Sequence, residues 1–150
     1  MKTRNKFKRV LVMCMVALMA LVSAVPTMNV EAKSKTIKVQ PLSSGVYNYE
    51  CYGRRSGNNA TVKARCKRVY PLDDGMEDTF TKIRATAFKK TESGKMVQIS
   101  KGTLYVLEET KSAVSMRIRD GELKVKYVYF GFIGNSNNYG AHALVGYDAN

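Results

Sequence analysis

Residues 114–127 read VSMRIRDGELKVKY, and this stretch decides the class of fold. Apolar side chains alternate with polar ones on both sides of Asp120-Gly121, which is a period typical of β-strands. Asp-Gly between two alternating runs is a signal for a two-residue hairpin turn. Pairing outward from this turn places Ile118 opposite Leu123. The apolar face of the predicted hairpin then holds Val114, Met116, Ile118, Leu123, Val125 and Tyr127.

The opposite face of the same predicted hairpin is basic. Its cations are Arg117, Arg119, Lys124 and Lys126. A shift of one residue in the pairing would send every side chain to the wrong face, so the pattern favours a single register. We therefore expect a basic strand face on a stable hairpin.

A second hairpin is predicted around Asn58-Asn59, because asparagine tolerates the left-handed backbone of a tight turn. This register places Cys51 directly opposite Cys66, close enough for a disulfide after modest adjustment. We predict that a structural disulfide joins them, with two free thiols as metal ligands or a nucleophile as the alternative. The outward side of the second strand carries Lys63, Arg65 and Lys67.

Further short strands are predicted along the rest of the chain. Thr36–Gln40 is expected to be an edge strand that ends at Pro41, and Glu108–Ser112 is expected to form a helical turn. The other strands are expected at Thr81–Phe88, Met96–Ile99, Thr103–Leu107, Leu123–Ile133 and Ala141–Tyr147. The pattern predicts an all-β fold, an antiparallel β-sandwich or small barrel of roughly eight short strands with one disulfide-linked hairpin.

Residues 1–32 have the organisation of a secretory signal peptide. Five Lys and Arg residues precede the apolar run Val10–Val22, and small residues suited to cleavage follow it. Cleavage is expected after Ala32, with Ala24 as the alternative site. The run is shorter than the roughly 20 residues that a membrane-spanning helix needs, so a retained anchor is the less favoured reading. We expect a secreted, extracellular protein with one all-β domain over residues 33–150.

The chain is strongly basic, with 25 Lys and Arg against 12 Asp and Glu and a net charge of +13. Five of the basic residues and one of the acidic residues lie in residues 1–32, so the remainder keeps a net charge of +9. A charge of this size attracts polyanions. Outside a cell these are anionic cell-wall or membrane-surface polymers, and nucleic acid is an unlikely partner there. A charged surface that binds nothing is the alternative.

Residues suited to catalysis are sparse. His142 is the sole histidine, and it alternates out of phase with its apolar neighbours, so we expect it on an exposed strand face. Four carboxylates gather in the segment 73–78, but their spacing does not match a calcium-binding EF-hand loop. We expect no enzyme activity, cofactor or metal, and a small hydrolase built around His142 or the acidic segment is the weaker alternative.

The tyrosines interleave with the basic residues, and such aromatic rings can stack on sugars or bases. Tyr47-x-Tyr49 and Tyr127-x-Tyr129 form a faint echo, which shared hairpin chemistry explains better than duplication. The leading hypothesis is a non-enzymatic protein that binds anionic surface polymers, or a protein partner, through its basic strand faces. We predict no stable membrane insertion. A secreted, bacteriocin-like antimicrobial protein is the alternative.

Overall fold

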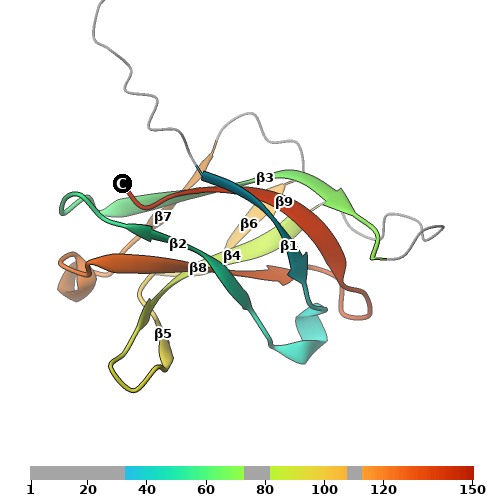
Figure 1. Ribbon diagram of the computed structural model, residues 1–150, viewed down its shortest axis with the longest axis horizontal. Coiled ribbons are helices and arrows are strands. Elements are labelled where there is room, and N and C mark those ends of the chain that lie inside the picture. The colour runs from blue at the N-terminus through green and yellow to red at the C-terminus, as the bar shows by residue number, and fades with distance from the viewer. Residues whose placement is uncertain (1–32, 73–81, 108–112) are drawn as a thin grey trace, which may run out of the picture. The chain divides into compact units, whose positions relative to one another are not determined.

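The computed structural model describes residues 33–72, 82–107 and 113–150. These residues form nine β-strands and two short 3-10 helices, and Figure 1 shows the strands arranged in two layers. The helices are η1 (Leu42–Ser44) and η2 (Asp120–Glu122). The strands are β1 (Lys33–Val39), β2 (Asn48–Arg54), β3 (Thr61–Tyr70), β4 (Lys82–Lys90), β5 (Met96–Gln98), β6 (Leu104–Leu107), β7 (Val114–Arg117), β8 (Tyr127–Gly134) and β9 (Ala141–Asp148).

The strands build two antiparallel sheets. The four-stranded sheet has the order β1-β9-β3-β7, and the five-stranded sheet has the order β2-β8-β4-β5, with β6 also paired to β4. We call them sheet A and sheet B. The predicted all-β sandwich is therefore confirmed at the level of its architecture. In the described part of the chain, no helix is long and apolar enough to cross a membrane.

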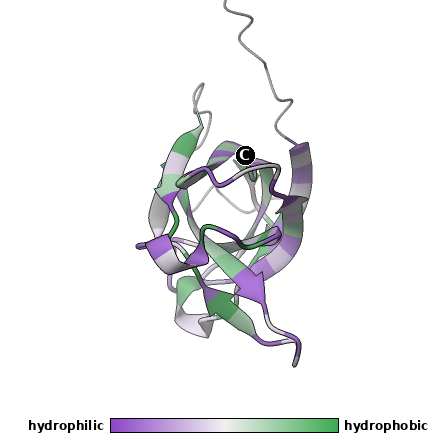
Figure 2. Cartoon of the chain, turned by 90° about the vertical axis from the view of Figure 1, so that its left-hand side faces the viewer, coloured by the Kyte–Doolittle hydropathy of each residue, from purple (hydrophilic) through white to green (hydrophobic). Residues whose placement is uncertain are grey.

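Alternation along the strands explains the core between the sheets. Val62, Ala64 and Cys66 on β3 are fully buried, while the residues between them lie on the outer side of sheet A. Phe130 and Phe132 on β8 are the largest fully buried side chains of sheet B. Figure 2 shows hydrophilic and hydrophobic residues alternating along strands that curve around this shared interior. Each sheet thus has one apolar inner face and one outer face.

Several predicted strands match the structure. β1 is an edge strand of sheet A that ends before Pro41, and β4 directs Ile83, Ala85 and Ala87 into the core. The hairpin between β4 and β5 turns through Gly94. The backbone φ of Gly94 is 84°, a value that glycine adopts without the steric cost that a Cβ would bring. The expected signal peptide, the acidic segment 73–78 and the helical turn at 108–112 lie outside the described residues.

The predicted hairpin at Asp120-Gly121 is wrong. β7 pairs with β3 in sheet A, whereas β8 pairs with β2 and β4 in sheet B. Asp120–Glu122 forms η2, and the following Leu123 and Val125 pack against the core. The apolar residues of this stretch are therefore buried between the two sheets, and the two halves of the stretch do not pair with each other.

The predicted disulfide-linked hairpin is also wrong. Cys51 on β2 lies opposite Phe130 in sheet B, and Cys66 on β3 lies opposite Val145 in sheet A. Both side chains are fully buried in the core, and no disulfide forms within the described residues. Burial raises the pKa of the Cys51 thiol to about 12. The turn at Asn58-Asn59 connects two sheets, so the predicted register of opposed cysteines does not exist.

Candidate anion-binding site

Two segments that are far apart in the sequence enclose a pocket of about 280 Å³. The first segment runs from the end of β2 into the β2–β3 loop, and the second joins η2 to β8. We call this site the basic pocket. Its lining consists of Arg54, Arg55, Ser56, Gly57, Asn58, Leu123, Lys124, Val125 and Lys126. Four of these nine residues are cationic and none is acidic, so the lining favours an anion.

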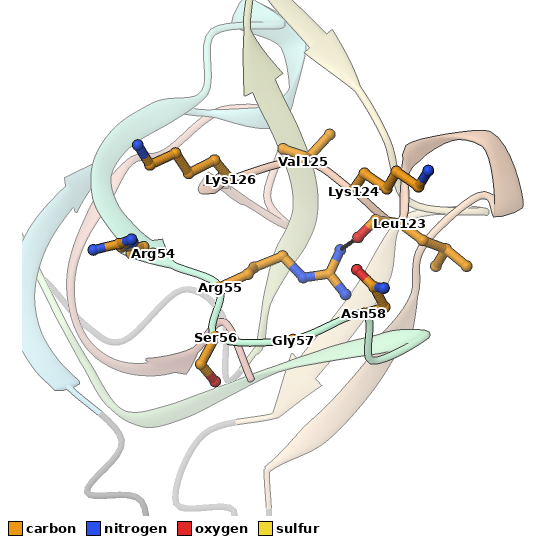
Figure 3. A pocket seen from close by; sticks show the side chains of 9 residues that line it. All are labelled: Arg54, Arg55, Ser56, Gly57, Asn58, Leu123, Lys124, Val125 and Lys126. Carbon is orange, nitrogen blue, oxygen red and sulfur yellow. Dashed lines mark hydrogen bonds between the residues drawn. The ribbon is translucent and has the colours of Figure 1, made fainter.

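Arg55 holds the two walls of the pocket together. Its backbone N–H donates to the carbonyl of Lys126 at 3.0 Å, and its Nη1 donates to the carbonyl of Leu123 at 3.0 Å. Nη2 donates to the carbonyl of Asn59 within the same β2–β3 loop. Figure 3 shows the Arg55 side chain extended between the walls, with its guanidinium beside Asn58. One arginine thus fixes the geometry of both segments.

The Arg55 side chain is also a buried positive charge. Only 6% of the residue is exposed, and its Nε atom has no hydrogen-bond partner among the described residues. Burial lowers the pKa of the guanidinium, but arginine remains protonated at physiological pH. Within the described residues no carboxylate pairs with this guanidinium, so an anion that enters the pocket would stabilise the buried charge.

Three exposed cations surround the buried one. Arg54 and Lys126 extend from neighbouring chain segments, and Lys124 extends on the other side of the pocket (Figure 3). Within the described residues, ion pairs involve other cations, and Arg54, Lys124 and Lys126 make none. Their charges are therefore available to a ligand.

The second wall is itself anchored to the sandwich. Lys89 on β4 donates from Nζ to both carboxylate oxygens of Glu122, at 2.6 and 2.7 Å. The first wall is tied at the C-terminus, where the Asn150 side chain accepts hydrogen bonds from the Ser56 N–H and hydroxyl. These contacts hold the pocket on fixed supports, which reduces the cost of ordering it around a ligand.

The structure separates the seven cations predicted as the polyanion site. Lys124 and Lys126 line the basic pocket. Lys63, Arg65 and Lys67 lie on β3, and Arg117 lies on β7 beside Thr61 of β3. Because β3 and β7 are neighbours, Lys63, Arg65 and Arg117 share the outer face of sheet A. Arg119 is exposed and follows β7, directly before η2.

The outer face of sheet A is basic. Arg65 lies across Gly146 of β9, where a Cβ would approach the arginine Nε to 2.9 Å. The guanidinium of Arg68 stacks on the Tyr70 ring at 4.8 Å. His142 lies on this face between Lys38 and Tyr70 in the register of three strands. This position agrees with the prediction that His142 lies on the outer face of its strand. We call Lys63, Arg65 and Arg117 the basic strand face.

The sequence prediction missed Arg54 and Arg55 as site residues. The signal that identifies them is two adjacent arginines that end a strand and precede the turn-rich run 56–59. Among the described residues, no group of His, Cys, Asp and Glu could hold a metal ion.

Comparison with known proteins gives no match. No protein-family model, curated protein or solved structure resembles the chain. The function is therefore argued from the geometry of the site.

Proposed function

We propose that this chain is a secreted, non-enzymatic protein that binds anionic polymers of a cell surface through the basic pocket. The observation that carries the proposal is the arrangement of Arg54, Lys124 and Lys126 around the buried Arg55, with no acidic residue in the lining. A phosphate or carboxylate group of such a polymer fits the charge of this site. The signal-like residues 1–32 support export to the compartment where these polymers occur.

The location of the charges favours a specific contact over general attraction. Cations gathered around a concave site attract an anion more strongly than the same cations spread over a flat surface. The basic strand face contributes mainly to long-range attraction, because its cations lie on an open sheet. Loss of cations that line the pocket is therefore expected to weaken binding more than loss of cations outside it.

Co-sedimentation of the purified protein with Gram-positive cell walls tests the proposal. The pocket variant replaces Arg54, Lys124 and Lys126 with Ser. The matched control replaces Lys63, Lys67 and Arg119 with Ser, and it removes the same net charge from outside the pocket. Both variants must give the wild-type circular dichroism spectrum before binding is compared.

The wild-type protein is expected to pellet at low salt and to be released at high salt, because salt screens exposed charges. A cation near an anionic surface contributes about 1 kcal/mol, so loss of three predicts about 100-fold weaker binding of the pocket variant. The control variant is expected to keep most of its affinity. Absence of pelleting at low salt, or equal loss in both variants, would overturn the proposal.

A further inference from the structure

The outer face of sheet B carries a continuous row of aromatic rings. Inward residues of this sheet include Cys51 and Phe130, so their strand neighbours Tyr52 and Tyr129 point outward. Tyr52 stacks on Tyr129 with ring centroids 5.4 Å apart and an interplanar angle of 27°. We call this row the aromatic stripe, and it consists of Tyr47, Tyr49, Tyr52, Phe88, Tyr127 and Tyr129.

The far part of the stripe is packed around Phe88 of β4. Tyr47 and Tyr49 contact the Phe88 ring edge-on, with centroid distances of 5.3 and 5.0 Å. Gly131 makes this packing possible, because a Cβ there would lie 2.5 Å from the Phe88 ring and 3.0 Å from Tyr49. The rings are therefore held in place before any ligand binds.

The near part of the stripe begins at the basic pocket. Tyr127 lies opposite Arg54 in the sheet register, and the Lys126 ammonium lies 5.9 Å from the Tyr127 ring centroid. Arg54 and Lys126 also line the pocket. The stripe extends from there along β8 for about 14 Å between Tyr127 and Gly131, at about 3.4 Å per residue. A ligand bound in the pocket can thus continue onto the rings.

Two rings of the stripe, Tyr52 and Tyr127, are exposed to a ligand, whereas Phe88 is 8% exposed and serves to pack Tyr47 and Tyr49. Tyr52 is 53% exposed and Tyr127 is 43% exposed, which is unusual for large aromatic residues on a folded protein. Exposed aromatic residues that gather on one face mark an interaction surface. Tyrosine offers a flat apolar ring and a hydroxyl, which suits a ligand that has both apolar faces and hydroxyl groups.

From this continuity we infer that the ligand is an acidic polysaccharide, whose sugar rings stack on the aromatic stripe while one of its acidic groups occupies the basic pocket. The inference rests on the proposed function and narrows the class of polymer. Charge complementarity supports it, since the cations stand at the pocket end of the stripe. The row formed by Tyr52, Tyr129 and Phe88 carries no cation.

The distribution of cations along the aromatic stripe also disfavours a nucleic acid as the ligand. Single-stranded nucleic acids bind where a positively charged groove follows the backbone alongside the stacking rings. In the next row Thr86 and Gly131 are uncharged, and the following cation on the outer side of β4 is Arg84, one row further on and opposite Ile133. A chain of sugars that carries its acidic groups at intervals matches cations that are separated by uncharged aromatic rows.

Affinity measurements with three polymers test the inference, using polygalacturonate, inorganic polyphosphate and single-stranded oligo-dT. The test variant is Tyr52→Ala, and Tyr52→Phe keeps the ring without its hydroxyl. Tyr139→Ala is the matched control, because Tyr139 is 45% exposed in the β8–β9 loop, away from the stripe. The chain has no Trp and nine Tyr, of which five belong to the stripe, so a ligand that stacks on the stripe is expected to change the tyrosine fluorescence.

Polygalacturonate is expected to bind more tightly than polyphosphate and to change the tyrosine fluorescence. Tyr52→Ala should weaken polygalacturonate binding about 10-fold, a typical effect of losing one stacked ring. It should leave polyphosphate binding unchanged, while Tyr52→Phe and Tyr139→Ala should bind polygalacturonate nearly as the wild type does. This pattern would support the inference.

The other outcomes separate the inference from the proposed function. Equal binding of polygalacturonate and polyphosphate, with no effect of Tyr52→Ala, would overturn the stripe as a sugar site and leave the pocket as an anion site. Tighter binding of oligo-dT that is lost in Tyr52→Ala would assign the stripe to nucleic acid instead. Failure to bind any of the three polymers would overturn both.

Discussion

Replacement of Arg55 by Met is expected to destabilise the fold, although it removes a buried charge. The variant loses the guanidinium hydrogen bonds to the carbonyls of Leu123 and Asn59. Hydrogen bonds from charged groups contribute about 1.5–3 kcal/mol each, so two of them give a gross loss of roughly 3–6 kcal/mol. Relief from burying the charge offsets part of this loss, as replacements of buried ion pairs show. We expect a net destabilisation of about 2 kcal/mol.

The matched control for this experiment is Arg54→Met. Arg54 is the preceding residue, it is exposed, and its side chain makes no ion pair within the described residues. The control therefore removes the same charge from the same segment without removing the link between the pocket walls. Surface substitutions of this kind typically change stability by less than about 0.5 kcal/mol.

Urea unfolding followed by circular dichroism measures the difference. With a urea dependence of about 2 kcal/mol/M, a loss of 2 kcal/mol lowers the midpoint by about 1 M. Arg54→Met should unfold close to the wild-type midpoint. If Arg55→Met unfolds at the same urea concentration as Arg54→Met, or at a higher one, then Arg55 does not hold the pocket walls together.

Three further predictions concern other parts of the sandwich. Gly131→Ala should destabilise the protein by about 1–3 kcal/mol, because the added methyl group overlaps the Phe88 ring. Gly57→Ala is the control, because a Cβ there meets nothing within 4 Å. Equal thermal unfolding of the two variants would contradict this packing. The hydrogen bond to Lys35 lowers the pKa of Glu50, so this carboxylate stabilises the fold above its unfolded pKa and loses that effect as the pH falls through its folded pKa. Glu50→Gln should accordingly be less stable than the wild type near neutral pH and equal to it in strong acid, and a gap that persists in acid would refute the pairing. Burial raises the pKa of the Cys51 thiol to about 12. Cys51 should therefore resist iodoacetamide at pH 8 in the native protein and react in urea, as peptide mapping can show. Lack of reaction in urea without reductant would instead indicate a disulfide.

The sequence predicts the class of fold because alternation depends only on which side of a strand is buried. Lys63 and Arg65 were placed on the outward side of their strand, and the residues that alternate with them, Val62, Ala64 and Cys66, are buried as this placement requires. The same pattern does not identify the partner strand, because the same residues of a strand are buried whichever strand pairs with it. Asn58-Asn59 and Asp120-Gly121 were interpreted as hairpin turns, but the strands that flank each of them belong to different sheets.

The candidate site was predicted in part for the same reason. Lys124 and Lys126 were predicted to lie on a strand face. Because the predicted hairpin does not form, they lie instead in the wall of the basic pocket. Arg54 and Arg55 join them only because the β2–β3 loop lies against the segment before β8. That proximity arises from tertiary packing between segments about 70 residues apart, which no local pattern of residues encodes.

The prediction of the aromatic residues has a related limit. Tyr127 was assigned to the inner face of a hairpin, but it lies on the outer face of sheet B and is 43% exposed. The inward residues of β8 begin at Val128, one residue later. Because the side-chain period of a strand is two, a shift of one residue reverses every assignment. The aromatic stripe therefore becomes visible only in the structure.

The central claim is that an anionic polymer binds in the basic pocket, and an amide-resolved NMR titration with soluble teichoic acid tests it most directly. We predict saturable, salt-sensitive shifts of the amide signals of residues 54–58 and 123–126, which line the pocket. We also predict that these shifts disappear in the Arg54, Lys124 and Lys126 triple Ser variant. Shifts confined to β3 and β7, or no saturable shifts at low salt, would contradict the account.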